Sequence, residues 1–78
     1  MKKVFVEVIV KYRIDGMKTP LSIIWSNGKE YIIDKVTEVK RAASLKAGGL
    51  GVRYKCRISG RETYLWFEDN ERWFVEGK

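Results

Sequence analysis

The sequence predicts an all-β protein that folds as one small barrel of about six mostly antiparallel strands. Two observations predict this fold class: apolar residues recur at every second position over much of the chain, and short turns containing Gly or Asn separate these runs. A chain of 78 residues supports only one domain, so we expect residues 1–78 to form a single unit. Closure into a barrel would also remove the unpaired edges that an open sheet exposes.

The first half of the chain reads as strands joined by turns. Residues 4–14 alternate and place a row of mostly apolar side chains on one face: Val4, Val6, Val8, Val10, Tyr12 and Ile14. Asp15-Gly16 predicts the turn that ends this strand. Pro20 has no backbone donor, so the next strand, 21–25, is expected at an edge or just after the proline. Asn27-Gly28 then predicts a hairpin that leads into a strand over 30–35.

Strict alternation fails after residue 35. Val36, Val39 and Ala43 have helix-like spacing, which leaves two alternatives: a bulged, bent strand, or a short helical turn near 36–46. We favour the bent strand, followed by a glycine-rich loop over 42–51.

The second half predicts two hairpins. Residues 52–58 alternate without a break, Ser59-Gly60 connects them to a strand over 61–67, and residues 68–71 connect that strand to 72–76.

Each assumed turn predicts a register. With Ser59-Gly60 as a two-residue loop, Arg53 faces Trp66 across the strands. With Asp69-Asn70 as the next loop, Trp66 in turn faces Trp73. A slip of one residue at either turn would move side chains to the opposite face.

The positive charge is concentrated in one segment. The chain carries 16 Lys and Arg against 10 Asp and Glu, a net charge of +6. Residues 35–57 hold seven of the basic side chains and one acidic one, so this segment accounts for the whole net charge. A basic segment on a neutral scaffold indicates a surface for an anionic partner, although a solvated face is the alternative interpretation.

The predicted registers collect cations and aromatic rings on one sheet face. Single-stranded nucleic acid needs this combination, because cations bind phosphates and rings stack on bases. The predicted binding residues are Arg53, Lys55, Arg57, Tyr64, Trp66 and Trp73, assisted by Lys40, Arg41 and Lys46. We therefore expect a binding module for single-stranded DNA or RNA with low sequence specificity.

Two alternatives remain for this face. Arg53 could instead lie over the Trp rings in cation–π packing within the chain. Trp66, Trp73 and Val75 could also form an apolar patch that docks a protein partner or a second copy in a weak homodimer.

Composition argues against several other functions. The chain has no His and one Cys, which excludes His-based metal sites, Cys–His and Ser–His nucleophiles, and an internal disulfide. Cys56 falls on the apolar face and is expected to be buried and inert. No two carboxylates are placed for acid–base work, so we expect no enzyme, cofactor or metal. No apolar run is long enough to span a membrane or to act as a signal peptide, and a cytoplasmic location is expected.

Two stretches carry a resemblance to known proteins. Residues 24–36, together with 53–60, Leu65 and 73–76, resemble a group of short bacterial proteins of unknown function. The pattern W-x-x-G-x-x-Y-x-I, formed by Trp25, Gly28, Tyr31 and Ile33, also resembles SH3-like small barrels, with an OB-like barrel as the alternative. This resemblance implies a barrel and leaves the partner open, because such barrels serve nucleic acids, peptides and subunit assembly. The acidic loops and proline-docking rings of peptide-binding SH3 domains have no residue-by-residue match here.

Overall fold

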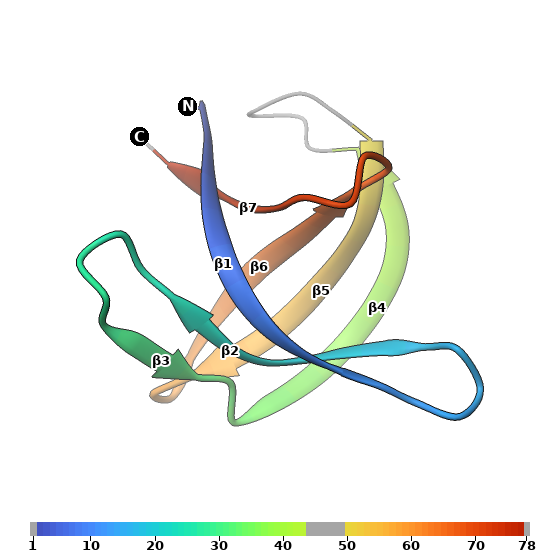
Figure 1. The fold of residues 1–78 in the computed structure, drawn as a ribbon, viewed down its shortest axis with the longest axis horizontal. Coiled ribbons are helices and arrows are strands. Elements are labelled where there is room, and N and C mark those ends of the chain that lie inside the picture. Colours follow the sequence, from blue (N-terminus) through green and yellow to red (C-terminus); the bar gives the residue numbers. More distant parts are fainter. Residues whose placement is uncertain (1, 44–49, 78) are drawn as a thin grey trace.

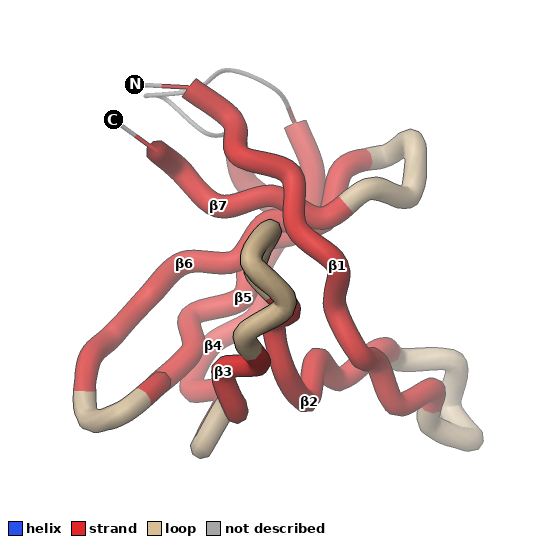
Figure 2. The backbone as a smooth tube through the Cα atoms, turned by 60° about the vertical axis from the view of Figure 1, so that its left-hand side comes forward, coloured by secondary structure: helices blue, strands red, loops and turns tan. Residues whose placement is uncertain are grey.

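The chain folds into one curled, fully antiparallel sheet. The computed structural model describes residues 2–43 and 50–77, and this part of the chain contains strands and short loops without a helix (Figures 1 and 2). Seven strands follow one another: β1 (Lys2–Tyr12), β2 (Lys18–Ile24), β3 (Glu30–Ile32), β4 (Lys35–Ala43), β5 (Leu50–Ile58), β6 (Arg61–Glu68) and β7 (Trp73–Gly77). Their order in the sheet is β3-β2-β1-β7-β6-β5-β4. The predicted all-β small barrel is confirmed, with one strand more than expected because β4 is a separate strand.

β1 belongs to both halves of the barrel. Its first part, Lys2–Val6, pairs with β7, whereas Glu7–Tyr12 pairs with β2, so the strand bends from one side of the barrel to the other (Figure 1). Val6 and Val8 pack against the core, as the alternation predicts. Tyr12, the last residue of β1, and Ile14, in the turn that follows, do not pack against the core and are exposed.

The core lies on the inner face of the curled sheet. Its buried residues are Ile23, Ile33, Tyr54, Cys56 and Leu65, and partly buried valines and rings from β1 and β4 to β7 pack around them. The buried residues come from β2, β5, β6 and the corner after β3, and the partly buried ones add β1, β4 and β7, so the core needs the whole barrel to assemble. Their burial removes apolar surface from water, which is the main favourable contribution to folding.

β4 is the bent strand that the broken alternation indicated. Its register against β5 shifts between Val36 and Glu38, which makes Thr37 the extra residue of a β-bulge. Thr37 Oγ1 donates a hydrogen bond to the carbonyl oxygen of Lys55 at 3.2 Å. The helical alternative is therefore wrong for residues 35–43, and residues 44–49, with most of the glycine-rich loop, lie outside the described residues.

Pro20 lies within β2 instead of preceding a strand. It pairs with Val10 next to a register shift, and the bulged residue is Leu21. β3 pairs only with Ser22–Ile24, so β2 is an edge strand at Pro20, and the bulge beside it is where a sheet tolerates the missing N–H.

The barrel closes at the β3–β4 corner and opens beyond it. The Ile33 N–H donates to the Leu21 carbonyl at 2.9 Å, and the Asp34 N–H donates to the Arg57 carbonyl at 2.8 Å. These two bonds link β2 to β5 through the corner. Past the corner, the first half of β2 and the free edge of β4 diverge and leave an open seam.

Three of the hairpins have the same three-residue loop. In the β1–β2, β2–β3 and β6–β7 turns, the third loop residue has positive φ: Gly16 at 86°, Gly28 at 84° and Glu71 at 66°. In the last of these, the Glu68 N–H donates to the Arg72 carbonyl at 2.8 Å, so residues 69–71 form the loop. The Asn27-Gly28 hairpin is thus confirmed with Ser26 as part of its loop, whereas the assumed two-residue loop Asp69-Asn70 is wrong.

The extra loop residue changes the register of β7. The β5–β6 register is confirmed throughout, from Gly51 opposite Glu68 to Ile58 opposite Arg61. In the β6–β7 hairpin, however, Trp66 lies opposite Phe74 and Phe67 lies opposite Trp73. The predicted pairing of Trp66 with Trp73 is wrong by one residue, and this places the two Trp side chains on opposite faces of the sheet.

Candidate nucleic-acid interface

The outer faces of β4 and β5 carry five cationic side chains. We call this surface, together with Tyr64 of β6, the basic face; its cations are Lys35, Lys40, Arg53, Lys55 and Arg57. Strict alternation along β5 places its three cations on the face opposite Tyr54 and Cys56 of the core. Lys35 and Lys40 lie opposite Arg57 and Arg53 in the β4–β5 register, so all five point outward together.

Two of these cations are already held by carboxylates. Arg53 binds Glu38 at 2.8 Å, and its guanidinium lies over the Tyr64 ring, 4.5 Å from the ring centroid. The hydrogen bond from Arg53 lowers the pKa of Glu38 below the usual range of a glutamate, so the carboxylate stays charged. Glu38 therefore offsets one positive charge in the middle of the basic face.

Lys55 is held in a similar way from the other neighbouring strand. It binds Glu62 at 3.0 Å, and this hydrogen bond raises the pKa of Lys55. The sequence places Glu62 opposite Arg57, and that register is confirmed, but the carboxylate reaches diagonally to Lys55. Arg57 is consequently exposed and has no ion pair in the described part of the chain.

Like charges meet directly across the β4–β5 pair. Lys35 lies opposite Arg57, and Lys40 lies opposite Arg53. Like charges at directly opposite positions of a sheet repel and reduce its stability. Neither Lys35 nor Lys40 has an ion pair with the described residues, so an anion bound at either point would relieve the repulsion.

Trp66 is on the basic side of the sheet but is not exposed. Only 4% of it is accessible, and its ring stacks on Phe74 with centroids 5.9 Å apart and an interplanar angle of 7°. Phe5 contacts Phe74 edge to face, and Lys3 lies over the Phe74 ring. Trp66 therefore belongs to a small aromatic cluster on the outer face and is not available to stack on a base.

Trp73 lies on the opposite, inner face. Its ring centroid is 5.3 Å from that of Tyr54 and 4.7 Å from that of Phe67, both of which belong to the core. The structure thus does not bring Trp66, Trp73 and Val75 to one exposed patch. Tyr64, 40% exposed, is the ring that the basic face presents to solvent.

Arg41, another predicted residue, is separate from the basic face. Arg41 lies on β4 opposite Val52, an inner-face position, and forms an ion pair with Asp69 in which both oxygens are 3.0 Å from Nη2. Lys46 lies outside the described residues. Lys35 was part of the charge segment but not of the predicted site, because the β-bulge at Thr37 hides its position in the alternation.

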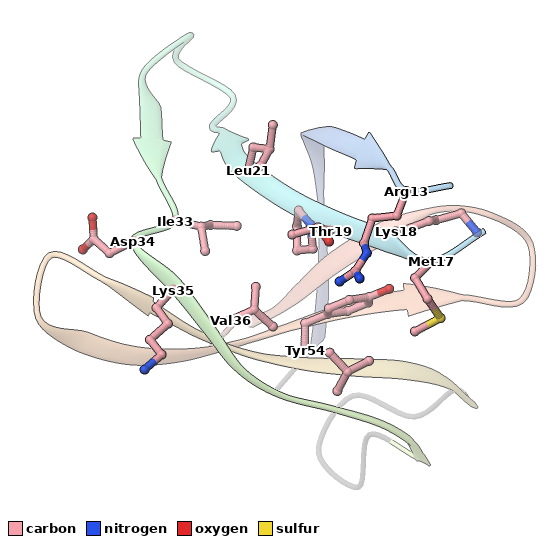
Figure 3. A pocket seen from close by; sticks show the side chains of 12 residues that line it. Arg13, Met17, Lys18, Thr19, Leu21, Ile33, Asp34, Lys35, Val36 and Tyr54 are labelled. Carbon is pink, nitrogen blue, oxygen red and sulfur yellow. The ribbon is translucent and has the colours of Figure 1, made fainter. Parts of the chain in front are cut away.

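A pocket lies in the open seam between β2 and β4. It has a volume of about 420 Å³, and Figure 3 shows the Tyr54 ring below the Arg13 side chain, with Val36 on one side and Met17 on the other. Arg13 and Lys18 line it together with apolar side chains. A second hollow of about 510 Å³ continues from it past Val39 to the β6–β7 turn.

The described residues include a buried cysteine and no metal-binding group. Cys56 is buried as expected, and this burial raises the pKa of its thiol to about 11, which disfavours the reactive thiolate. Among these residues, no three His, Cys, Asp or Glu side chains form a metal-binding group. No helix in the described ranges could cross a membrane.

Comparison with known proteins gives no match: no protein-family model, no curated protein sequence and no solved structure matches the chain. The resemblance to SH3-like barrels and to short bacterial proteins therefore stays a prediction.

Proposed function

We propose that this protein binds single-stranded nucleic acid with low sequence specificity through the basic face. The observation that carries the proposal is the β4–β5 register, which places Lys35 opposite Arg57 and Lys40 opposite Arg53 on the outer surface. Phosphates placed between these cations would replace repulsion by attraction and would release counterions.

Charge, more than stacking, would provide the affinity. Trp66 and Trp73 are engaged within the protein, so Tyr64 is the one ring of the proposed basic face that is available to a base. Contacts to phosphates carry no sequence information, which is why low specificity is expected. The binding constant should accordingly fall steeply with salt concentration.

The test is fluorescence anisotropy of a labelled, mixed-sequence single-stranded oligonucleotide, titrated with protein at about 50 mM and about 200 mM salt. A label on the oligonucleotide is preferable to protein fluorescence, because Trp66 is buried and Trp73 packs on the core. Binding that weakens at the higher salt concentration supports the proposal, and the absence of binding at both concentrations contradicts it.

Arg57→Ala and Lys35→Ala locate the site. Neither side chain has an ion pair to lose with the described residues, so each variant should keep the fold. Each should weaken binding and reduce the slope of log affinity against log salt by about 1. Lys29→Ala, in the β2–β3 turn, removes the same charge away from the basic face and should change neither. If all three variants bind like the wild type, the basic face is not the site.

A further inference from the structure

β4 has a free edge that is unusually long for an isolated domain. β4 is the last strand in the sheet order and pairs with β5 along one edge. Within residues 2–43 and 50–77, no strand pairs with its other edge, although β4 has nine residues. Such an edge presents unpaired N–H and C=O groups and is a template for another strand, so isolated proteins keep their edge strands short, cover them, or place charges and bulges on them. β4 has charged residues and a bulge at Thr37, but the stretch beyond the bulge is regular.

The residues along this edge are complementary to themselves. Glu38 and Lys40 flank Val39, and both point to the outer face, whereas Val39 faces the seam and is 42% exposed. If two copies paired antiparallel about a two-fold axis at Val39, Glu38 of each copy would lie opposite Lys40 of the other. The same pairing would bring the two Val39 side chains together and cover them.

The neighbouring registers are unfavourable. A two-fold axis perpendicular to the sheet keeps outer residues opposite outer residues, so the axis must pass through a residue position. If it moved to Glu38, two glutamates would face each other, and if it moved to Lys40, two lysines would do so. Of these three registers, only the one centred on Val39 pairs opposite charges.

The pairing would also complete contacts that a single copy leaves open. Lys40 lies opposite Arg53 and has no ion pair with any described residue. Glu38 uses Oε1 for Arg53, and its side chain is 45% exposed, so it can accept a second cation. Within its own chain, Lys40 is close enough to Glu38 to help lower the pKa of that carboxylate, but it forms no ion pair with the described residues. Glu38 of a second copy would thus give Lys40 a direct ion pair.

We infer that two copies of this chain associate edge to edge through β4, in the antiparallel register centred on Val39. The two sheets become continuous, and the two-fold axis places both basic faces on the same side. Because edge pairing buries little surface, the dimer is weak and depends on concentration. This inference does not rest on the proposed function, because the association needs no nucleic acid.

Sedimentation equilibrium over a wide range of protein concentration tests the dimer. The wild type should pass from monomer to dimer as the concentration rises. Glu38→Lys and Lys40→Glu should each weaken the dimer about ten-fold or more, because each places like charges opposite each other twice. Lys40→Glu removes no ion pair with the described residues, so it remains informative if Glu38→Lys, which loses the contact to Arg53, unfolds.

Mixing the two variants gives the sharpest result. One carries Lys at both positions and the other Glu at both, so they should form a heterodimer although each alone stays monomeric. The double exchange Glu38→Lys with Lys40→Glu should restore the homodimer. Glu30→Lys and Lys29→Glu, near β3 at the opposite end of the sheet, are charge-matched controls and should leave the dimer unchanged.

Three outcomes would overturn the inference: a wild type that stays monomeric at the highest concentration, a dimer insensitive to both charge reversals, or a mixture without heterodimer. In the first case, the edge of β4 would not pair with a second copy, and a strand of another protein would be the remaining candidate to pair with it. The two proposals share Lys40, but Lys35 and Arg57 lie outside the charge pairs of the dimer, so the Lys35→Ala and Arg57→Ala titrations test the basic face separately.

Discussion

The β5–β6 and β6–β7 hairpins share one strand and differ by one loop residue. Ser59 and Gly60 join β5 to β6 with positive φ at both residues, 51° and 77°, which is the two-residue turn whose twist matches that of the strands. Residues 69–71 join β6 to β7, and only Glu71 has positive φ. Because side chains alternate with a period of two, the additional residue turns all side chains of β7 to the opposite face.

The difference decides what the aromatic residues do. The two-residue turn places Arg53 and Trp66 opposite each other on the outer face, as expected. The three-residue turn places Phe74 beside Trp66 and sends Trp73 to the core. An expected surface for stacking bases is therefore a closed aromatic cluster on one face and part of the core on the other.

The largest predicted effect tests the β6–β7 register. Phe74 is 2% exposed, and Phe74→Ala should lower the free energy of unfolding by about 3–5 kcal/mol, measured by urea denaturation. The milder variants Phe74→Leu and Trp66→Leu should keep the chain folded. In a double-mutant cycle, they should show a coupling of about 0.5–1.5 kcal/mol, because their rings stack. In the matched cycle of Trp66 with Trp73, the two effects should add without coupling. Coupling of Trp66 to Trp73, and none to Phe74, would contradict the observed register and support the predicted two-residue loop.

The second prediction compares the carboxylates at the two ends of β6. Glu68 is buried and bound by Lys3, and the hydrogen bond from Lys3 lowers the pKa of Glu68 below 4.5. The stability from this contact is therefore present above the pKa of the unfolded chain and is lost as pH falls through the lower folded pKa. Glu68→Gln should lower stability by about 1–2 kcal/mol at neutral pH and less in acid.

Glu62, at the other end of β6, is the control. Its side chain is 51% exposed and pairs with Lys55, so Glu62→Gln should change stability little at any pH. Thermal unfolding of both variants between pH 7 and about pH 3 distinguishes them. Equal losses would mean that the contact of Lys3 with Glu68 is no stronger than a surface ion pair.

The smallest predicted effect is a gain in stability. Glu71 adopts the positive φ that Gly16 and Gly28 adopt at the same position of the other three-residue loops. Glu71→Gly should relieve this strain and raise the free energy of unfolding by about 0.5–1 kcal/mol. Glu71→Ala removes the same charge and keeps the strained φ, so it should not stabilise. If alanine stabilises as much as glycine in thermal unfolding, the cause is charge and not backbone conformation.

Local pattern predicted most of the fold. The alternation in β1 and β5 predicted those strands, Ser59-Gly60 predicted the β5–β6 register, and the failure of alternation after residue 35 indicated the bulge at Thr37. Each of these features depends on residues that are close in sequence. The β6–β7 turn was predicted less well, because Asp69, Asn70 and Glu71 are all compatible with a turn and only the hydrogen bond from Glu68 to Arg72 decides the loop length.

The candidate site, too, was predicted only where it depends on residues that are close in sequence. The alternation predicted that Arg53, Lys55 and Arg57 share one face, and they do. Their partners depend on β4 and β6, so the contacts with Glu38, Glu62 and Tyr64 appear only when these strands are paired. That Lys35 belongs to the basic face could be recognised only from the observed register of β4 and β5 on both sides of the bulge.

The sequence by itself determined the fold class, the position of most strands and the concentration of positive charge in residues 35–57. These properties follow from residue type and from spacing along the chain, which need no distant contact. Only the tertiary structure decided which rings are buried, which cations are neutralised and which strand edge is left free. Those properties depend on pairing between strands far apart in the chain, where a shift of one residue exchanges the inside of the sheet for the outside.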